Sequence, residues 1–277
     1  MSKELIYMSF ATQKGGAGKT PFTILAASWL HYKLGYNVAV IDCDYPQNSL
    51  AGNRKRDLDC MMKNEYYKKV AKEQFFAIEK KFYPVVGCDV QRALKWITSG
   101  ADEVIDAAIE EMGFSDNLDV VLFDMPGTIN QSEVDAETKK RRGVLSLVAC
   151  MDYIFCPIRA DRAAVDSSLL FIKAVQEQII NRRVGALQRF FLFWTEVDGR
   201  EKTRVYDIVE KVASKFSFPI LNTRIPYMLR FRKESLDTYD IFKSTLFPAK
   251  PSLAKDAKID VFMEEICEKV NLKADLD

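Results

Sequence analysis

Residues 5–20 read LIYMSFATQKGGAGKT, in which an apolar run leads into a glycine-rich loop that ends in Lys19 and Thr20. The run Leu5–Phe10 predicts a buried β-strand, and the apolar positions after Lys19 predict a helix that continues to about Leu34 and stops at Gly35. Glycine allows backbone N–H groups to surround an anion, and the start of a helix adds positive partial charge. The stretch therefore predicts an α/β fold with an anion-binding turn between its first strand and its first helix.

The second half of this loop satisfies the general phosphate-loop pattern G-x-x-x-x-G-K-[ST] through Gly18, Lys19 and Thr20. Gln13 stands where that pattern has its first glycine, and an additional lysine, Lys14, follows it. In such a loop Lys19 reaches the β- and γ-phosphates of a nucleotide, and the Thr20 hydroxyl ligates Mg²⁺. A glycine turn without a ligand is the alternative, but the strand, loop, lysine, hydroxyl and helix all agree on phosphate binding.

The rest of the chain alternates short apolar runs with longer amphipathic segments, which predicts a mainly parallel sheet covered by helices. Continuous apolar runs such as Val120–Phe123 fit strands that are buried on both faces. We therefore expect a doubly wound α/β fold. The further strands that we predict are Asn37–Ile41, Leu118–Phe123, Tyr153–Ile158, Phe190–Thr195 and Pro219–Ile225, and the further helices are Ala163–Asn181, Lys202–Phe216 and Ile259–Val270.

A length of 277 residues suits one large α/β domain, and no linker-like stretch divides the sequence. We expect residues 1–277 to form this single domain. Residues 54–90 fit the alternation of strands and helices poorly, because they are rich in charged and aromatic side chains. We predict a helical insertion at the edge of the sheet in this region.

The composition disfavours several classes of protein. Lys and Arg number 40 against 39 Asp and Glu, so no global basic excess points to a nucleic-acid partner. The six cysteines form no CxxC pair and the chain has one histidine, which disfavours a zinc site and histidine-based catalysis. Residues 1–20 hold no signal-peptide pattern, and no apolar run reaches the roughly 18–20 residues of a membrane span. We expect a soluble protein of the reducing cytoplasm with no membrane partner.

Acidic residues end two of the predicted strands. Asp42 and Asp44 close the second strand, and Asp124 closes the run Leu118–Phe123. The carboxyl ends of parallel strands line the crevice in which such sheets bind ligands. A buried strand that delivers one acid to this crevice makes Asp124 a candidate ligand of Mg²⁺. For Asp42 and Asp44, capping of the following helix is the alternative to a role in the site.

Taken together, these motifs resemble the ParA/MinD superfamily of P-loop ATPases. Residues Lys14–Thr20 resemble its deviant Walker A loop, with Ala17 where the family usually has valine. Residues Asp42–Gln47 resemble its Asp-x-Asp-Pro-Gln segment, with Tyr45 interposed, and this spelling is also similar to ParA-like proteins of conjugative mobile elements. Weaker matches extend the resemblance over most of residues 5–235 outside the 54–90 region, at Asp124–Pro126, Tyr153–Arg159, Thr195–Arg200 and Thr223–Pro226.

The resemblance implies a SIMIBI-like P-loop NTPase that binds ATP and Mg²⁺. It implies that Lys14 reaches across an ATP-dependent homodimer to the partner's phosphates, and that Asp44 orients the attacking water. It also implies that Asp42 supports a metal shell to which Thr20 and Asp124 belong. The nucleotide contacts that it implies are those of Lys14, Gly15, Gly16, Ala17, Gly18, Lys19, Thr20, Pro21 and, at the adenine, Pro226.

Partition ATPases of this family bind DNA non-specifically through basic residues in the second half of the chain. Residues 200–233 hold nine Lys and Arg against three acids, an excess of six in a nearly neutral protein. A solvated, charged helix face is the alternative interpretation of this excess. The DNA-binding candidates are Arg224, Arg230, Arg232 and Lys233. The resemblance implies DNA partition or maintenance of a mobile element, nucleoid association, and an activator with a ParB-like role.

Three alternatives within the superfamily stay open. A MinD-like membrane-associated ATPase needs a basic amphipathic C-terminal helix, whereas Met263–Glu268 is acidic. An iron–sulfur reductase needs paired cluster cysteines, and only Cys88 has a suitable context. A metabolic ATPase of the ligase or amidotransferase type would turn over a small molecule without DNA. A purely structural nucleotide fold is disfavoured by the presence of Lys19 and Asp44.

Overall fold

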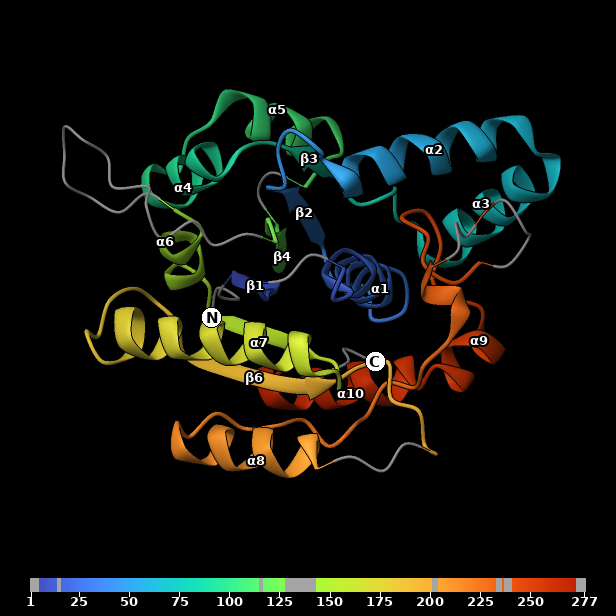
Figure 1. Ribbon diagram of the computed structural model, residues 1–277. Helices are drawn as coiled ribbons and strands as arrows, with labels where there is room; N and C mark the ends of the chain where they lie inside the picture. Colours follow the sequence, from blue (N-terminus) through green and yellow to red (C-terminus); the bar gives the residue numbers. More distant parts are fainter. Residues whose placement is uncertain are drawn as a thin grey trace.

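The computed structural model describes residues 5–13, 16–114, 117–127, 143–200, 204–232, 236 and 241–272, with the side chain of Arg232 excepted. Its centre is a six-stranded sheet in the order β3-β2-β4-β1-β5-β6, and every neighbouring pair is parallel (Figure 1). The strands are β1 Ile6–Phe10, β2 Val38–Asp42, β3 Val85–Gly87, β4 Val120–Asp124, β5 Tyr153–Ile158 and β6 Arg189–Trp194.

Successive residues along each strand enter two different cores, because side chains of a strand alternate between its faces. In β4, Val120 and Leu122 join one core while Val121 and Phe123 join the other. The first core is completed by α1 (Lys19–Tyr32), α9 (Pro251–Asp256) and α10 (Ile259–Val270). The second is completed by α4 (Val90–Ser99), α5 (Glu103–Glu111), α6 (Val144–Ala149), α7 (Arg162–Val175) and α8 (Val205–Lys215).

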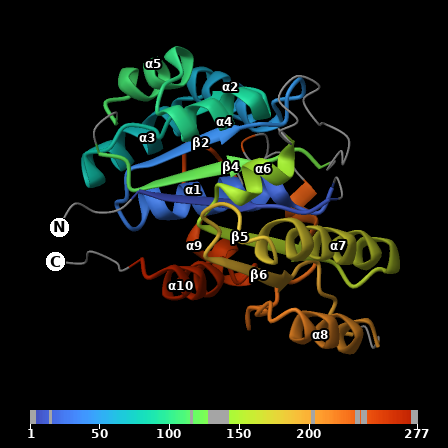
Figure 2. The ribbon, with the colours of Figure 1, turned by 90° about the vertical axis from the view of Figure 1, so that its left-hand side faces the viewer.

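Helices therefore cover both faces, and the prediction of a doubly wound parallel sheet is confirmed (Figure 2). Five of the six predicted strands are present, each within two residues of its expected limits. The helix expected over Ala163–Asn181 is α7 continued by a π-helical turn, Gln176–Ile180. Among the described helices, none combines the length and the apolar character that a membrane crossing requires.

The strand predicted at Pro219–Ile225 is wrong. This segment runs beside β6, where it forms one isolated bridge, between Leu192 and Ile220, and a separate hydrogen bond of 2.9 Å from the Ile225 N–H to the Trp194 carbonyl. The backbone N–H groups of Asn222 and Thr223 donate instead to the Glu265 carboxylate on α10, at 2.6 and 2.8 Å. Because these two successive donors bind α10, the pairing with β6 is interrupted between the hydrogen bonds of Leu221 and Ile225, and no regular strand forms.

Residues 49–78 form the two helices α2 (Ser49–Lys63) and α3 (Glu65–Ile78) before the edge strand β3. The helices meet at Asn64, whose side chain accepts a hydrogen bond from the N–H of Tyr66. Tyr67 of α3 is buried against Leu246 and Phe247 in a small separate core. The region expected as a helical insertion thus holds a helical hairpin and, at its end, a strand that the sequence analysis did not predict.

A buried polar cluster fastens α2 to the segment that precedes α9. The Asp57 carboxylate accepts hydrogen bonds from the Thr245 N–H at 2.7 Å, the Thr245 hydroxyl at 2.8 Å and the Ser244 hydroxyl at 3.1 Å. Arg54 donates to the Thr245 hydroxyl and carbonyl, each at 3.0 Å. These bonds satisfy charged groups that would otherwise be costly to bury.

We expect Asp57→Ala to lower the free energy of unfolding by about 2–4 kcal/mol, because it strands several buried donors and leaves Arg54 without its counter-charge. Urea denaturation followed by circular dichroism measures this loss. Asp59→Ala is the matched control, since Asp59 is exposed on the same helix and its removal should change stability by less than about 0.5 kcal/mol. Equal stability of the two variants would contradict a structural role for the cluster.

Candidate functional site

The loop between β1 and α1 adopts backbone angles that glycine favours. Gly16 and Gly18 have φ values of 73° and 91°, in the left-handed region that side chains disfavour. Gly18 also serves as the N-cap of α1, and a Cβ atom there would lie 3.0 Å from the ring of Phe22. Ala17 is buried between them. The sequence therefore folds this turn with the start of α1 behind it, while Lys14 and Gly15 lie outside the described residues.

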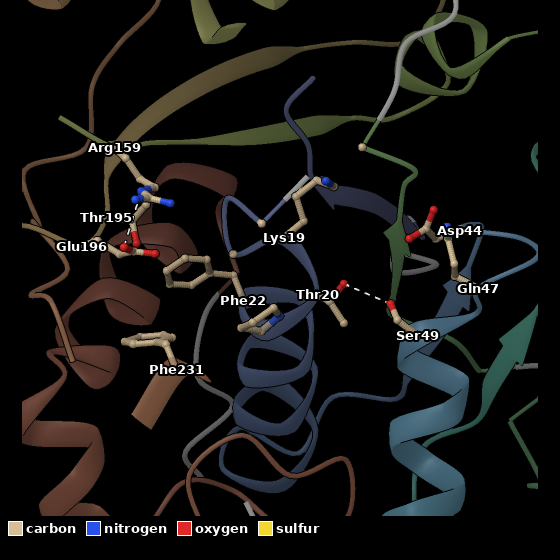
Figure 3. Close-up of a pocket in the computed structure, with 14 residues that line it drawn as sticks. Lys19, Thr20, Phe22, Asp44, Gln47, Ser49, Arg159, Thr195, Glu196 and Phe231 are labelled. Atoms are coloured by element: carbon tan, nitrogen blue, oxygen red, sulfur yellow. Dashed lines mark hydrogen bonds and ion pairs between the residues drawn. The ribbon is translucent and has the colours of Figure 1, made fainter. Parts of the chain in front are cut away.

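The two residues that begin α1 face the carboxyl end of β4. The Thr20 hydroxyl donates a hydrogen bond of 2.6 Å to Oδ2 of Asp124. Ser49, the first residue of α2, places its own hydroxyl 3.5 Å from that of Thr20 (Figure 3). Two hydroxyls and a carboxylate thus meet where α1, α2 and β4 end or begin.

Asp124 is buried, and burial raises the pKa of its carboxyl group to about 7. The hydrogen bond from Thr20 and the charge of Lys19 oppose this rise, whereas the neighbouring Asp42 adds to it. Oδ1 of Asp124 is buried with no hydrogen-bond partner in the described structure. A buried carboxylate oxygen without a donor is costly, so this position is suited to a cation.

Lys19 is 8% exposed, and burial lowers the pKa of its ammonium group. The carboxylates of Asp124 and Asp44 oppose this change. An ammonium group with little hydration interacts strongly with a phosphate brought beside it. The position of Lys19 at the start of α1 fits the role that the phosphate-loop pattern assigns to it.

Asp42 makes the contacts of a helix cap. Its Oδ2 accepts hydrogen bonds from the N–H groups of Leu50 and Ala51 at 2.8 and 2.9 Å, and its Oδ1 accepts from the N–H of Asp44 at 3.2 Å. The pKa of Asp42 is raised, chiefly by burial, although these N–H groups oppose the rise. Asp42 therefore orients the start of α2 and the loop that carries Asp44, and its support of a metal shell stays a prediction.

A cavity of about 750 Å³ runs along this edge of the sheet. That volume lies within the usual range of small-molecule sites. Figure 3 shows Asp44, Gln47 and Ser49 on one side of Lys19 and Thr20, and Arg159, Thr195, Glu196 and Phe231 on the other. The complete lining is Gly16, Gly18, Lys19, Thr20, Pro21, Phe22, Asp44, Gln47, Ser49, Gly127, Arg159, Thr195, Glu196 and Phe231.

The cavity brings together most of the predicted nucleotide-binding residues, but Pro226 does not line it. Pro226 instead forms an isolated parallel bridge with Val197. Sequence analysis missed Ser49, Arg159, Glu196 and Phe231 as cavity residues. Ser49 could have been found from its place two residues after Gln47. Arg159 and Glu196 lie within the family matches at Tyr153–Arg159 and Thr195–Arg200, which assigned them no task, and Phe231 enters the cavity only through the tertiary fold.

The residues present fit Mg²⁺ with a nucleotide. Mg²⁺ prefers oxygen ligands and takes one or two protein groups together with phosphates and water. The Thr20 hydroxyl and the Asp124 carboxylate supply such oxygens at the end of the glycine loop. Lys19 supplies the cation that would face the phosphates.

The DNA-binding candidates lie at a distance along the chain from this loop. Arg224 is exposed, its guanidinium carbon lies 4.8 Å above the ring of Tyr206, and it approaches Glu210 at 3.5 Å. Arg230 and Arg232 lie in the 3₁₀ helix Leu229–Arg232, which also carries Phe231 into the cavity. Lys233 is outside the described residues.

The site combines a glycine loop between a parallel strand and a helix with a lysine and a hydroxyl group. Both lie near a carboxylate at the end of a neighbouring strand. This combination defines a P-loop nucleotide-binding protein. A family model described as the CobQ/CobB/MinD/ParA nucleotide binding domain matches residues 8–238. The chain therefore belongs to this family, and the resemblance to ParA and MinD is confirmed. No curated protein matches the chain in a sequence comparison.

Solved structures share the fold at low sequence identity. MinD of Pyrococcus horikoshii complexed with Mg-ADP has a TM-score of 0.55 and 16% identity, covering 99% of this chain and 100% of that one. The ATP complex of a McdA variant from Cyanothece has a TM-score of 0.55 and 14% identity, covering 100% of this chain and 99% of that one. The structure named pnob8 ParA has a TM-score of 0.52 and 15% identity, and the match covers 97% of this chain and 99% of that one.

The raised pKa of Asp124 predicts how stability depends on pH. Its carboxyl group has a pKa of about 7 in the folded chain against an ordinary value of 3.8, so the folded state holds more protons between these values. Stability therefore falls as the pH rises through this window and stays lowered above it. We expect nucleotide-free Asp124→Asn to be more stable than the wild type at pH 8, by at most about 4 kcal/mol, with the gain closing toward pH 4.

Urea unfolding at a series of pH values without Mg²⁺ measures this difference. Asp166→Asn is the matched control, because Asp166 is exposed on α7 and its substitution should leave the pH dependence unchanged. If the wild type has the larger free energy of unfolding at pH 8, the ionised Asp124 carboxylate does not destabilise the folded chain, and the prediction is wrong.

Proposed function

We propose that this protein is an Mg²⁺-dependent ATPase of the ParA type, whose ATP-bound dimer binds DNA non-specifically and is reset by slow hydrolysis. The observation that carries the nucleotide part is the contact of Thr20 with Asp124, beside a buried Lys19 at the end of a glycine loop. The Mg-ADP and ATP complexes of the structural neighbours MinD and McdA support the choice of ATP and Mg²⁺.

Each site residue has a proposed task. Lys19 and the backbone N–H groups of Gly16–Thr20 bind the phosphates, a task supported by the presence of Gly16, Gly18, Lys19 and Thr20 in the cavity lining. Thr20 and Asp124 hold Mg²⁺, which when bound neutralises charge on the phosphate oxygens. Asp44 lies in the cavity lining near Lys19 and orients the attacking water. Lys14 is assigned to the partner's phosphates in the dimer.

The proposed DNA surface is formed by Arg224, Arg230, Arg232 and Lys233, and the exposed basic residues of the neighbouring helix α8 add to its charge. Arg204, Lys211, Lys215 and Arg224 are exposed there, against the exposed acids Asp207 and Glu210. A few basic residues per monomer give weak binding at physiological salt, whereas a dimer doubles the number of phosphate contacts. DNA binding would then depend on ATP, and a partner with a ParB-like role would stimulate its release. The protein would associate with the nucleoid in the cytoplasm.

The nucleotide part is tested with Lys19→Ala. We expect the variant to lose tight Mg-ATP binding, by about 100-fold or more in Kd, because a buried cation no longer faces the phosphates. Isothermal titration calorimetry measures both affinities. Lys72→Ala is the control, because Lys72 is exposed on α3 and outside the cavity lining. Equal Mg-ATP affinity in Lys19→Ala and the wild type would remove the phosphate-loop assignment.

The DNA part is tested with Asp44→Ala. This variant should bind Mg-ATP without hydrolysing it, so that the dimer stays on DNA and is retained several-fold more than the wild type. Retention should fall steeply with salt, since log affinity drops by about 0.9 per neutralised phosphate for each log unit of salt. Gel shifts with and without ATP over a salt series measure this retention.

Two further variants separate dimerisation from DNA contact. Lys14→Ala should bind ATP but fail to dimerise or to remain on DNA, whereas joint replacement of Arg230, Arg232 and Lys233 by Ala should remove DNA binding and leave the ATP-dependent dimer intact. The partition-type proposal fails if neither the wild type nor Asp44→Ala shows ATP-stimulated DNA binding at low salt. That result would favour a metabolic ATPase of the same family.

A further inference from the structure

The end of the cavity away from Asp44 carries an ion pair and an aromatic ring. Arg159 follows β5 directly, and Thr195 and Glu196 follow β6 directly. Phe231 comes from the short 3₁₀ helix Leu229–Arg232. Figure 3 shows these side chains gathered on the opposite side of Lys19 and Thr20 from Asp44. A nucleotide whose phosphates lie on the glycine loop would therefore extend its base toward them.

The Arg159 guanidinium is held between two carboxylates. Its Nε lies 3.4 Å from Oε2 of Glu196 and 3.3 Å from Oδ2 of Asp161. Asp161 is itself fixed, because its Oδ1 caps α7 by accepting a 2.9 Å hydrogen bond from the N–H of Ala164. A guanidinium also carries terminal N–H donors in the same plane as Nε–H. The pair thus presents a donor group next to an acceptor group.

The backbone holds Glu196 in an unusual conformation. Its φ is 54°, in the left-handed region that is uncommon for residues other than glycine. Hydrogen bonds hold the residues on both sides: Thr195 N–H donates to Ile158 O at 2.9 Å, and Val197 N–H donates to Ile225 O at 3.0 Å. Strained conformations of this kind persist where the surroundings fix them, often at ligand sites. The bridge between Val197 and Pro226 belongs to the same support.

Phe231 offers a flat apolar surface at this end. Its ring lies 5.5 Å from that of Phe22 and 5.1 Å from that of Phe242, so neighbouring rings support it. The ammonium group of Lys243 donates a 2.9 Å hydrogen bond to the Phe231 carbonyl, which holds the 3₁₀ helix in place. Aromatic rings stack on nucleobases because both are flat and polarisable.

We propose that Glu196 and Arg159 select the adenine of the nucleotide, with Phe231 as the surface against which the base stacks. This inference rests on the ATPase function proposed above. The Glu196 carboxylate accepts a hydrogen bond from the 6-amino group, and the guanidinium of Arg159 donates to the adjoining ring nitrogen. A 6-oxo purine places an oxygen where the amino group stands, and this oxygen is repelled by the carboxylate.

The test compares Mg-ATP with Mg-ITP, which carries a 6-oxo group in place of the amino group, by calorimetry. Inorganic tripolyphosphate with Mg²⁺ serves as the probe that has no base. We expect the wild type to prefer ATP over ITP by about tenfold or more, the range that one charge-assisted hydrogen bond supports. In Glu196→Gln the preference should fall by about tenfold, because the amide can donate to the 6-oxo group. Tripolyphosphate affinity should stay within about twofold, since the base contact is absent from that probe.

Arg159→Lys provides a second variant that keeps the charge and removes the planar fork. It should weaken ATP by about tenfold and leave tripolyphosphate binding unchanged. Glu73→Gln on α3 is the matched control for Glu196→Gln, because it removes the same charge from an exposed position outside the cavity lining. It should preserve the wild-type preference for ATP.

Two results would overturn base selection by this pair while leaving the phosphate site intact. The first is a wild type that binds ITP as tightly as ATP. The second is an unchanged preference for ATP over ITP in Glu196→Gln together with an unchanged ATP affinity in Arg159→Lys. Wild-type protein that binds neither ATP nor tripolyphosphate would overturn this inference and the proposed nucleotide function together.

Discussion

The central strand β4 ends in Asp124, a carboxylate with almost no access to water. Burying this charge costs free energy, and the residues around the site offset that cost. Asp124 lies directly opposite Asp42 in the register of the sheet, so two acidic side chains are buried side by side. Repulsion and burial both favour the protonated forms. The Asp42 charge is offset by backbone N–H groups at the start of α2, and that of Asp124 by Thr20 and Lys19 at the start of α1. The positions of both helices are therefore tied to these two carboxylates.

This arrangement makes α2 a link between distant parts of the chain. At its first residue, Ser49 lies beside Thr20 in the cavity. Farther along, Arg54 and Asp57 bind the backbone and side chain of Thr245. Lys243, two residues earlier, holds the carbonyl of Phe231 at the other end of the cavity. The two ends of the cavity are thus joined through the α2 cluster as well as through the sheet.

The sequence predicted the parts of this structure that depend on local pattern. Strands such as Tyr153–Ile158 and the glycine loop were found because a continuous apolar run and a loop with Lys19 and Thr20 carry their own signals. The three-residue edge strand β3 was missed because so short a run shows no periodicity. The strand expected at Pro219–Ile225 failed because the Glu265 carboxylate, 42 and 43 residues away from the two N–H groups in the chain, takes its donors.

The site shows the same division. The end of the cavity that holds the glycine loop is contiguous in sequence, so the phosphate-loop pattern alone could name Gly18, Lys19 and Thr20 as its residues. Outside the site, the N-cap residues Asp89 and Asp102 are a local sequence signal for the starts of α4 and α5, and the sequence analysis did not use it. The other end of the cavity gave only a weak signal. Arg159 and Glu196 lie within the matches at Tyr153–Arg159 and Thr195–Arg200, which assigned them no task, and their meeting with Phe231 depends on the neighbouring positions of β5 and β6. Pro226 was assigned to the adenine by resemblance; it forms an isolated bridge with Val197 and does not line the cavity, and its contact with the base stays a prediction.

The charges of the cavity explain why a nucleotide would need a divalent cation here. In the described lining near the phosphate end, Lys19 faces the carboxylate of Asp44, and Asp124 lies behind Thr20. Arg159 is already paired with Glu196 and Asp161 at the other end. A nucleoside triphosphate adds several negative charges to this setting, so one ammonium group cannot balance them. Mg²⁺ held by Thr20 and Asp124 would reduce that repulsion, because it would give the buried carboxylate the counter-charge that the folded chain supplies only in part.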